Sequence, residues 1–361
     1  MKINYPTITY SSIVKIGENV QKLESDTKLK YLKLHRGVMD VTNIDINSLG
    51  IDLNLNDLKL QQYSSNDGYT ELIGKIKSEF NLNEHKVIIT PGGMAALDLI
   101  INSLSEDKFY IPNFHWGSWN KILKVHSKSI STFNDFNLSE FNKTDGVVML
   151  CYPSNPTGFC PKTEDIINFL KWSKNNGVTI ILDLPYYYLF KDVNDELSNH
   201  FYDNVILVSS FSKSIGLSGY RVGYISTKNE ALYDTLKTRS LYKYNSISTL
   251  PQYIIYKLLC NKTVVNDYKE ETIKHISNNI TYLKDNGLLS NIYTLDPIGP
   301  FAIININHEV LLKNRISSVP LNSFTLNKEE TNNDLSRISL AVNHEMFVEY
   351  FDNMLKQKNH L

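Results

Sequence analysis

The chain has 361 residues, of which 42% are hydrophobic and 21% are charged, and its formal net charge is −1. This is the composition of a globular protein, and it excludes a disordered, fibrous or membrane-embedded chain. A net charge so close to zero gives no electrostatic argument for a nucleic acid or a membrane surface as a partner.

The cysteines, the N-terminus and the apolar runs all favour a cytoplasmic protein. The 3 cysteines form no CxxC pair, which fits a reducing compartment and argues against a disulfide framework. The first residues, MKINYPTITYSS, lack the apolar core of a signal peptide. The longest apolar run, VTIILDLPYYYLF, is interrupted by Asp183 and Pro185, so we expect no membrane span.

In chain order, apolar runs alternate with helical patterns from about residue 85. Helices are expected at 92–104 and at 163–177, the second with Thr163 as N-cap and Gly177 as C′ residue. Strands are expected at 85–90, 108–112, 146–152, 178–184 and 204–210. Continuous apolar strands are typical of a sheet covered on both faces, and their alternation with helices predicts a mostly parallel sheet. The fold class is therefore α/β.

The pattern changes after about residue 262. A helix at 271–289 precedes strands expected at 301–307 and 336–342, which indicates a smaller α+β unit. The N-terminal residues are expected to form an arm and a strand that pack on this unit. We therefore predict an N-terminal arm and small-domain segment at 1–45, a large domain at 46–255 and a small C-terminal domain at 256–361.

Ligands of mostly parallel sheets bind at the carboxyl ends of the strands, so the polar residues there should converge. The strand at 85–90 is followed by Gly92 and Gly93, which let the backbone approach a ligand, and the next helix start offers N–H groups to an anion. The strand at 108–112 is followed by NFHWGSW, whose rings can stack on a flat heterocycle.

The later strands end in further polar groups. Asn155 lies between prolines that fix a turn, Asp183 ends a strand, and Lys213 and Arg221 follow the last strand. Each has an ordinary explanation when taken alone, because such residues form turns, cap helices or lie on the surface. Their combination in this order is far more specific and predicts one site.

Together these motifs resemble the fold-type I enzymes that depend on pyridoxal 5'-phosphate (PLP), specifically class I/II aminotransferases of the aspartate aminotransferase type. The resemblance runs from about Leu34 to about Asn343 and is carried by YSSNDGYTEL, TPGGMAAL, IPNFHWGSW, SNPTG, DLPYY, SFSKSIGLSGYRVGY and SRISLAV. It implies a large PLP-binding domain and a smaller domain formed by the C-terminus and the N-terminal segment.

The resemblance implies that Lys213 forms a Schiff base with the cofactor, since only a primary amine makes an imine, and then moves the proton between substrate and cofactor. Asp183 would hold the pyridine nitrogen protonated, because a nearby carboxylate favours the charged form of its partner. Asn155 and Tyr186 would donate hydrogen bonds to the phenolic oxygen of PLP.

The same resemblance implies a phosphate site. Ser210, Ser212 and Arg221 are the expected side-chain ligands, and Arg221 supplies the charged fork. The backbone N–H groups of Gly93 and Met94 would add donors at the helix start. Family members often have a hydroxyl residue at the position of Met94, so this chain keeps only a backbone role there.

Five more residues follow from the resemblance. Trp116 is the expected ring-stacking residue, with Phe114 as the alternative. Tyr63 would reach a phosphate across a dimer interface, which implies a homodimer with shared active sites. Arg337 would clamp the substrate α-carboxylate bidentately, and Gly37 would line the substrate pocket.

The donor amino acid stays open at this point. Arg239 falls near the place where dicarboxylate-specific members carry a second arginine, although the flanking sequence departs from theirs and favours a surface position. The aromatic residues also allow an aromatic or large apolar donor; they include Phe114, Trp119, Tyr187 and Tyr242.

The expected function is transfer of an amino group from an L-amino acid to a 2-oxo acid, with 2-oxoglutarate as the expected acceptor, by a ping-pong mechanism through Lys213. A PLP-dependent lyase, cyclase or oxidase is the alternative, since the same residues would hold the cofactor. A non-catalytic PLP-binding regulator is disfavoured because the sequence has no room for a winged helix before the fold. No HExxH motif or ligand spacing among the 9 histidines predicts a metal.

Overall fold

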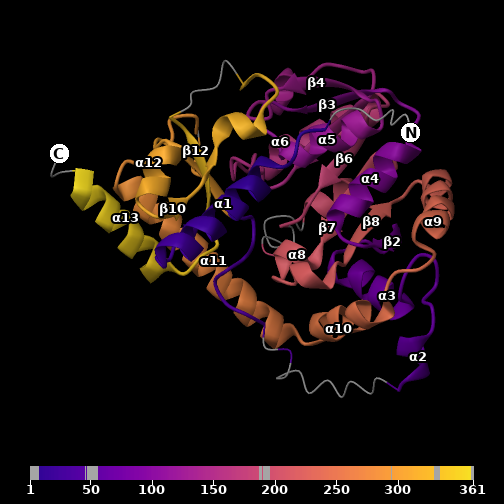
Figure 1. The fold of residues 1–361 in the computed structure, drawn as a ribbon. Helices are drawn as coiled ribbons and strands as arrows, with labels where there is room; N and C mark the ends of the chain where they lie inside the picture. Colours follow the sequence, from indigo (N-terminus) through magenta and orange to yellow (C-terminus); the bar gives the residue numbers. More distant parts are fainter. Residues whose placement is uncertain are drawn as a thin grey trace, which may run out of the picture.

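A seven-stranded sheet forms the centre of the larger part of the molecule (Figure 1). The computed structural model describes residues 8–44, 46, 56–186, 189, 196–293, 295–328 and 334–358. The strand order is β2 (Lys86–Thr90), β8 (Gly223–Thr227), β7 (Val205–Ser210), β6 (Thr179–Asp183), β5 (Val147–Cys151), β3 (Lys108–Pro112) and β4 (Ser129–Phe133). Every pairing from β7 to β4 is parallel, whereas β8 runs antiparallel to both β2 and β7. The prediction of an α/β fold with a mostly parallel sheet is confirmed.

Helices cover both faces of this sheet, which explains the continuous apolar strands. In β6, Ile181 packs in one core cluster with Leu97, whereas Ile180 and Leu182 belong to the core cluster on the other side. One cluster includes residues of α4 (Gly93–Ser103), α5 (Gly117–Val125) and α9 (Glu230–Tyr244). The other includes residues of α3 (Thr70–Glu79), α6 (Thr163–Asn175) and α10 (Thr249–Cys260).

The predicted helix at 163–177 differs from the structure by one residue at its start. Thr163 is the first residue of α6, and Lys162 takes the N-cap position without a side-chain cap bond. At the other end Gly177 follows the C-cap Asn176 with a φ of +67°, a left-handed conformation that glycine adopts without cost. Strands β4 and β8 are absent from the prediction, because their short sequences are less apolar.

The C-terminal part forms a smaller unit beside the sheet. Its antiparallel sheet has the order β11 (Val319–Pro320), β12 (Ser336–Ser339), β9 (Phe301–Ile304), and its helices are α11 (Lys262–Asp285), α12 (His308–Lys313) and α13 (His344–Lys358). The N-terminal segment joins this unit, since β1 (Leu32–Lys33) pairs in parallel with β10 (Ile316–Ser317). Residue 255 lies inside α10, and the proposed division of the chain at 45 and 255 stays a prediction.

The described residues also form short helical segments between the main elements. They are α2 (Leu58–Gln61), α8 (Phe211–Ser214) and the 3-10 segments η2 (Leu138–Glu140), η3 (Leu197–His200), η4 (Ser218–Tyr220) and η5 (Leu321–Phe324).

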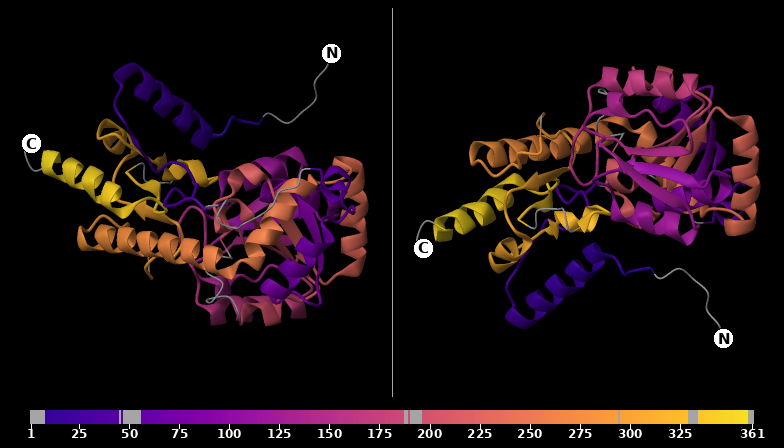
Figure 2. Two further views of the ribbon diagram at one scale, coloured as in Figure 1. Left: turned by 90° about the horizontal axis from the view of Figure 1, so that it is seen from below. Right: turned by 90° about the horizontal axis from the view of Figure 1, so that it is seen from above.

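The N-terminal segment contains a helix that the sequence analysis describes only as an arm. Helix α1 (Ser12–Thr27) lies along the outside of the smaller unit (Figure 2). Its first turns contact this unit, because Ile13 and Ile16 pack against a core cluster that contains Val319 and Phe324. Val20 is its one buried residue.

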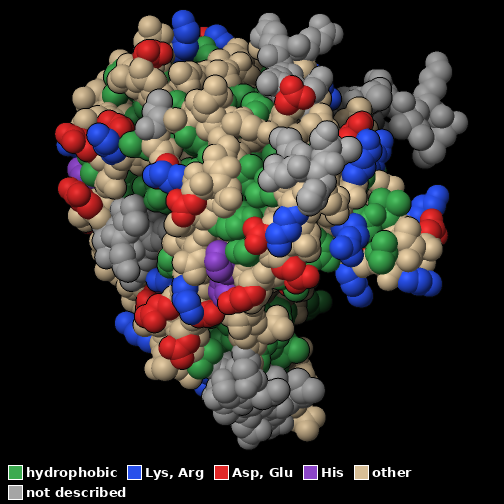
Figure 3. All heavy atoms as spheres, turned by 90° about the vertical axis from the view of Figure 1, so that its left-hand side faces the viewer, with side chains coloured by type: hydrophobic (Ala, Val, Ile, Leu, Met, Phe, Trp, Pro, Cys, Tyr) green, Lys and Arg blue, Asp and Glu red, His purple; other side chains and the backbone are tan. Residues whose placement is uncertain are grey.

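The surface of the smaller unit carries mixed charge. In the view of Figure 3, Lys and Arg side chains lie beside Asp and Glu side chains across this face. The mixture agrees with the formal net charge of −1 for the whole chain. In the part of the chain that the structure describes, no helix is both long and apolar enough to cross a membrane.

Gly223→Ala should destabilise the protein. A Cβ at this position would lie 2.7 Å from the carbonyl carbon of Gly92, 2.8 Å from the nitrogen of Gly93 and 2.8 Å from the oxygen of Ser209, and none of these backbone atoms can rotate away. We expect the free energy of unfolding to fall by about 1–3 kcal/mol in urea titrations. Gly219→Ala is the matched control, since a Cβ there meets nothing within 4 Å. Equal stability of the two variants would contradict the close approach of β8 to the turn before α4.

Candidate active site

A cavity of about 400 Å³ lies at the carboxyl ends of the parallel strands. The structure brings together around it every residue that the sequence analysis assigns to the site except Tyr63. The assigned residues in its lining are Gly37, Gly93, Met94, Trp116, Asn155, Asp183, Tyr186, Ser210, Ser212, Lys213, Arg221 and Arg337. Tyr63 is 82% exposed and lines no part of this cavity in the single chain, so its role across a dimer interface stays a prediction.

One end of the cavity is built to receive an anion. The Arg221 guanidinium donates to the Ser218 carbonyl at 2.9 Å and lies 3.4 Å from the Ser212 hydroxyl. Arg221 itself has a φ of +55°, a conformation that non-glycine residues rarely adopt and that is typical of functional sites. Gly92, with a φ of +92°, leaves room for this arginine, because a Cβ there would lie 2.6 Å from an Arg221 nitrogen.

The start of α4 faces the same end. Gly93 and Met94 are its first residues, and the first N–H groups of a helix have no acceptor within the helix. Ser210, the last residue of β7, pairs with Gly223 of β8 and thereby lies beside this helix start. The Met94 side chain is 45% exposed and apolar, so the chain offers only backbone donors at this position.

At the other end, Asp183 accepts a hydrogen bond from Trp119, which the sequence analysis considers only among the aromatic residues for substrate selection. The indole N–H of Trp119 donates to Asp183 Oδ2 at 3.2 Å, and Trp119 is fully buried. Burial raises the pKa of Asp183 to about 7, and the Trp119 hydrogen bond opposes this rise. The sequence carries no signal for this hydrogen bond, because Trp116 is the extended N-cap of α5 and its spacing from Trp119 therefore sets no common helix face.

Lys213 follows β7 in the short helix α8 and enters the cavity from the sheet side. Burial lowers the pKa of Lys213 to about 8, and the positive charges of Arg337, Arg221 and Arg36 lower it in the same direction. Roughly a tenth of this amine is therefore uncharged at pH 7, and this fraction can act as a nucleophile or a base.

Arg337 reaches the cavity from β12 of the smaller unit. It is 1% exposed, and its guanidinium lies 4.5 Å from the ring centre of Phe301 and 5.0 Å from that of Phe324. Nη2 donates to the His35 carbonyl at 2.9 Å, whereas Nε and Nη1 are buried without a hydrogen-bond partner among the described residues. A buried guanidinium with free donors is costly, so this geometry calls for a ligand with acceptor oxygens.

Asn155 and Tyr186 form the remaining polar wall. The Asn155 Oδ1 atom is buried without a partner among the described residues. Burial raises the pKa of Tyr186 well above its usual value, while a hydrogen bond with Asn155 opposes the rise. Both side chains therefore present neutral hydrogen-bonding groups to the cavity. Gly37 also lines the cavity, and a Cβ at this position would approach the Phe301 ring to 3.1 Å.

Among the described residues considered for substrate selection, none lines the cavity. Arg239 is exposed on α9 and donates to the Asn102 carbonyl at 2.5 Å. Tyr242 is 86% exposed, and Phe114 packs against the core of the smaller unit. Tyr187 lies outside the described residues.

The model of the protein family described as aminotransferase class I and II matches residues 45–351, so the chain belongs to this family. Histidinol-phosphate aminotransferase 2 of Oceanobacillus iheyensis is 29% identical over 254 residues, which cover 65% of this chain and 67% of that protein. A probable aspartate aminotransferase of Methanocaldococcus jannaschii is 29% identical over 185 residues, 46% of this chain and 49% of that protein. The solved structure of Thermus thermophilus aspartate aminotransferase with maleate has a TM-score of 0.77 and 17% identity, over 97% of each chain.

The protein is thus a transaminase, and its family depends on PLP. The described residues fit this cofactor. The cavity offers cationic and backbone donors at the Arg221 end, a carboxyl group at Asp183 and a lysine between them. The unpaired Asn155 amide oxygen marks a side chain whose hydrogen bonds the protein alone does not complete.

Asp183→Asn should flatten the pH dependence of stability of the cofactor-free protein. The pKa of Asp183 is about 7 in the folded protein, against about 3.9 when unfolded. Between these values the folded state binds more protons, so stability falls as pH rises. We expect the free energy of unfolding in urea to drop between about pH 5 and about pH 8 by up to about 3 kcal/mol more in the wild type than in the variant.

Trp119→Phe provides the comparison, because it keeps the carboxyl group and removes the hydrogen-bond donor. The pKa of Asp183 should then rise further, and the fall in stability should extend to higher pH. Asp135, whose pKa burial also raises to about 7, is common to all three proteins and cancels. If the stability of the wild type depended on pH in the same way as that of Asp183→Asn, the raised pKa of Asp183 in the folded protein would be contradicted.

Proposed function

We propose that the protein transfers the amino group of an L-amino acid to a 2-oxo acid in two half-reactions, with Lys213 as the catalytic lysine. The observation that carries this proposal is the placement of Lys213, with a pKa of about 8, in the cavity that also holds Asp183 and the buried guanidinium of Arg337. An amine, a carboxyl group and a carboxylate-binding fork around one cavity are what amino-group transfer requires.

The residues that would hold PLP lie at the two ends of the cavity. Arg221, Ser210 and Ser212 would bind its phosphate together with the first N–H groups of α4. Asp183 would accept a hydrogen bond from the ring nitrogen, and Trp116 would lie against the ring. When bound, the cofactor supplies an aldehyde that condenses with primary amines and an aromatic ring that withdraws electrons from the substrate Cα.

Lys213 has two tasks in this proposal. Its uncharged amine would be the nucleophile toward the cofactor aldehyde, and its lowered pKa would leave part of it uncharged near neutral pH. Once released, the amine stays in the cavity and accepts the proton of the substrate Cα, which it returns later in the half-reaction. The nearby charges of Arg337 and Arg221 lower the pKa of this amine, so that it is not permanently protonated.

Arg337 orients the substrate. Its two unpaired donors, Nε and Nη1, can bind both oxygens of an α-carboxylate, while the His35 carbonyl and the rings of Phe301 and Phe324 hold the guanidinium in place. With the carboxylate bound there, the Cα–H bond rather than the bond to CO₂ is directed for cleavage. This arrangement favours transamination over decarboxylation.

The acceptor and the assembly are further parts of the proposal. We take 2-oxoglutarate as the acceptor, and a homodimer as the active unit in which Tyr63 of one copy reaches the site of the other. The exposure of Tyr63, at 82%, leaves it available for such a contact. The named functions of the relatives, which include histidinol-phosphate and aspartate aminotransferases, support amino-group transfer without identifying the donor.

The visible absorption of PLP-loaded protein tests the proposal. Amino acids are added one at a time without a keto acid, and a true donor should remove the visible band of the bound cofactor. Addition of 2-oxoglutarate should restore this band, because the amino group then leaves the enzyme. Lys213→Ala should abolish the exchange, whereas Lys171→Ala, an exposed lysine of α6, should leave it unchanged.

Two outcomes would contradict the proposal. A band that disappears with a donor but never returns with any 2-oxo acid would favour a PLP-dependent lyase, cyclase or oxidase. Normal turnover in Lys213→Ala would contradict the assignment of Lys213 as the catalytic lysine.

Arg337→Lys should raise the KM for the amino-acid donor by about tenfold to a hundredfold, with a smaller effect on kcat. Lysine keeps the charge but loses the two-donor fork and the stacking on Phe301 and Phe324. Steady-state kinetics measure the effect. Arg239→Lys is the matched control, since Arg239 lies outside the cavity and should leave KM unchanged. An unchanged KM in Arg337→Lys would place the α-carboxylate elsewhere.

A further inference from the structure

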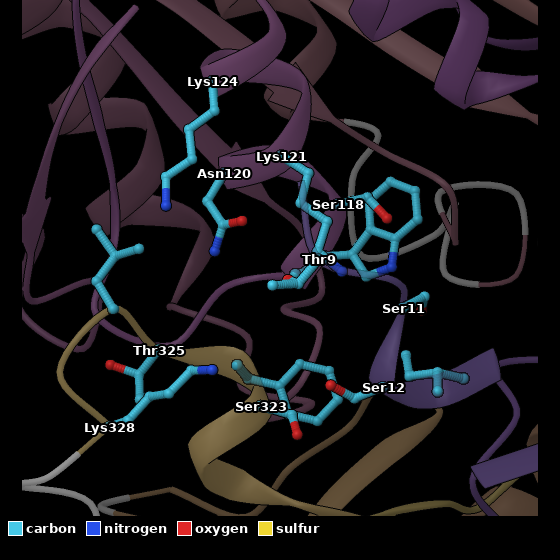
Figure 4. Close-up of a pocket in the computed structure, with 15 residues that line it drawn as sticks. Thr9, Ser11, Ser12, Ser118, Asn120, Lys121, Lys124, Ser323, Thr325 and Lys328 are labelled. Atoms are coloured by element: carbon cyan, nitrogen blue, oxygen red, sulfur yellow. The ribbon is translucent and has the colours of Figure 1, made fainter. Parts of the chain in front are cut away.

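A second cavity, of about 230 Å³, lies beside the first, and several lysines line it (Figure 4). It lies between α5, the residues before α1, and the segment that follows η5. We call it the lysine pocket, because Lys121, Lys124 and Lys328 line it. It has a common wall with the first cavity, formed by Ser11, Ile13, Trp116 and Ser118.

Positive charge in the lysine pocket has no acidic counterpart among the described residues. Its lining contains no Asp or Glu from the described part of the chain, and none of Lys121, Lys124 and Lys328 forms an ion pair with a described carboxylate. Glu329 and Glu330 follow Lys328 in the sequence and lie outside the described residues. Burial lowers the pKa of Lys121, and the charges of Lys328 and Lys15 lower it in the same direction. An anion in the pocket would relieve this repulsion.

The other polar groups of the lysine pocket suit an anion that accepts several hydrogen bonds. In Figure 4, the side chains of Lys124, Asn120 and Lys328 point into the same hollow. Ser323 and Thr325 add hydroxyl groups. A lysine amine has only donors, and hydroxyl and amide groups can donate as well, so this lining matches phosphate or carboxylate oxygens.

The wall between the two cavities determines what can reach the lysine pocket. Trp116 lies against the proposed cofactor ring on one side and lines the lysine pocket on the other. A substrate whose α-carboxylate is bound by Arg337 therefore has its amino group in the first cavity, while its side chain can extend past Ser118 and Ile13 toward the lysines. In the described residues of the single chain, Arg239 does not line either cavity and offers no alternative contact.

We propose that the lysine pocket binds an oxyanion at the far end of the substrate side chain, so that the amino-acid donor is one that carries a phosphate or a second carboxylate. This inference rests on the proposed function, because it assigns the α-amino end to the first cavity. Its new element is the set of residues that select the substrate, which are Lys121, Lys124 and Lys328.

Paired donors on the PLP-loaded enzyme test the inference. O-phospho-L-serine is compared with L-serine, and L-glutamate with L-glutamine, by the loss of the visible cofactor band. We expect the charged member of at least one pair to react with a KM at least about tenfold lower than its neutral partner, as expected for charge-assisted hydrogen bonds. The pair that shows the difference identifies phosphate or carboxylate as the preferred group.

The triple variant Lys121→Met, Lys124→Met, Lys328→Met assigns the effect to the lysine pocket. It should raise KM for the charged donor by at least about tenfold, leave KM for the neutral donor unchanged and keep kcat nearly constant. Lys171→Met is the control. If the triple variant does not fold, Lys124→Met and Lys328→Met serve singly, because both side chains are exposed and their loss should not disturb the core.

A direct binding measurement is independent of turnover. Inorganic phosphate and succinate are titrated into the PLP-loaded enzyme in a calorimeter. At least one should bind the wild type and Lys171→Met, and its affinity for the triple variant should be at least about tenfold weaker.

The failures can be told apart. Equal KM values for charged and neutral donors, or identical values in the triple variant and the wild type, would overturn the inference while the proposed function stands. If no donor of either kind removes the cofactor band and 2-oxo acids have no effect, the proposed function fails and the inference fails with it.

Discussion

Uncompensated positive charge is the constraint on which the site depends. Lys213, Arg221 and Arg337 line one cavity, and Asp183 is the acidic side chain that the described lining contains. Their mutual repulsion and their burial together hold the pKa of Lys213 near 8. The protein thus maintains a cationic interior that becomes favourable only when anions enter it. In the proposed function these anions are the cofactor phosphate at one end and the substrate carboxylate at the other.

The two anion positions come from different parts of the molecule. Arg221 and the start of α4 belong to the larger part that contains the seven-stranded sheet, whereas Arg337 projects from β12 of the smaller unit. The His35 carbonyl, next to β1, fixes the Arg337 guanidinium, so the N-terminal segment also contributes to the geometry. In the proposed function, substrate binding at Arg337 would therefore link three stretches of chain that are far apart in the sequence, and their relative placement would set the direction of the reacting Cα bond.

The sequence predicted the sheet and the site residues to different degrees, for physical reasons. Apolar runs such as 178–184 are unambiguous because both faces are buried, whereas the sequence of β8 is less apolar and α1 buries only Val20, and neither element was predicted. Residues that follow strands converge by topology alone, so Lys213 and Asp183 could be placed from their positions. Trp119 and the lysine pocket could not, because the first depends on a side-chain hydrogen bond and the second on the docking of residues 323–328 against α5.

The antiparallel strand β8 also bears on how the protein is synthesised. Among the described residues, strand β2 joins the sheet only through β8, which lies far later in the chain. During synthesis, β2 emerges from the ribosome before β8, and β2 therefore stays unpaired until β8 has emerged. Arg221 precedes β8 by two residues and arrives at the same moment. Edge closure of the sheet and completion of the phosphate end are then one late folding event, and a chain truncated before β8 would expose an unpaired strand to aggregation.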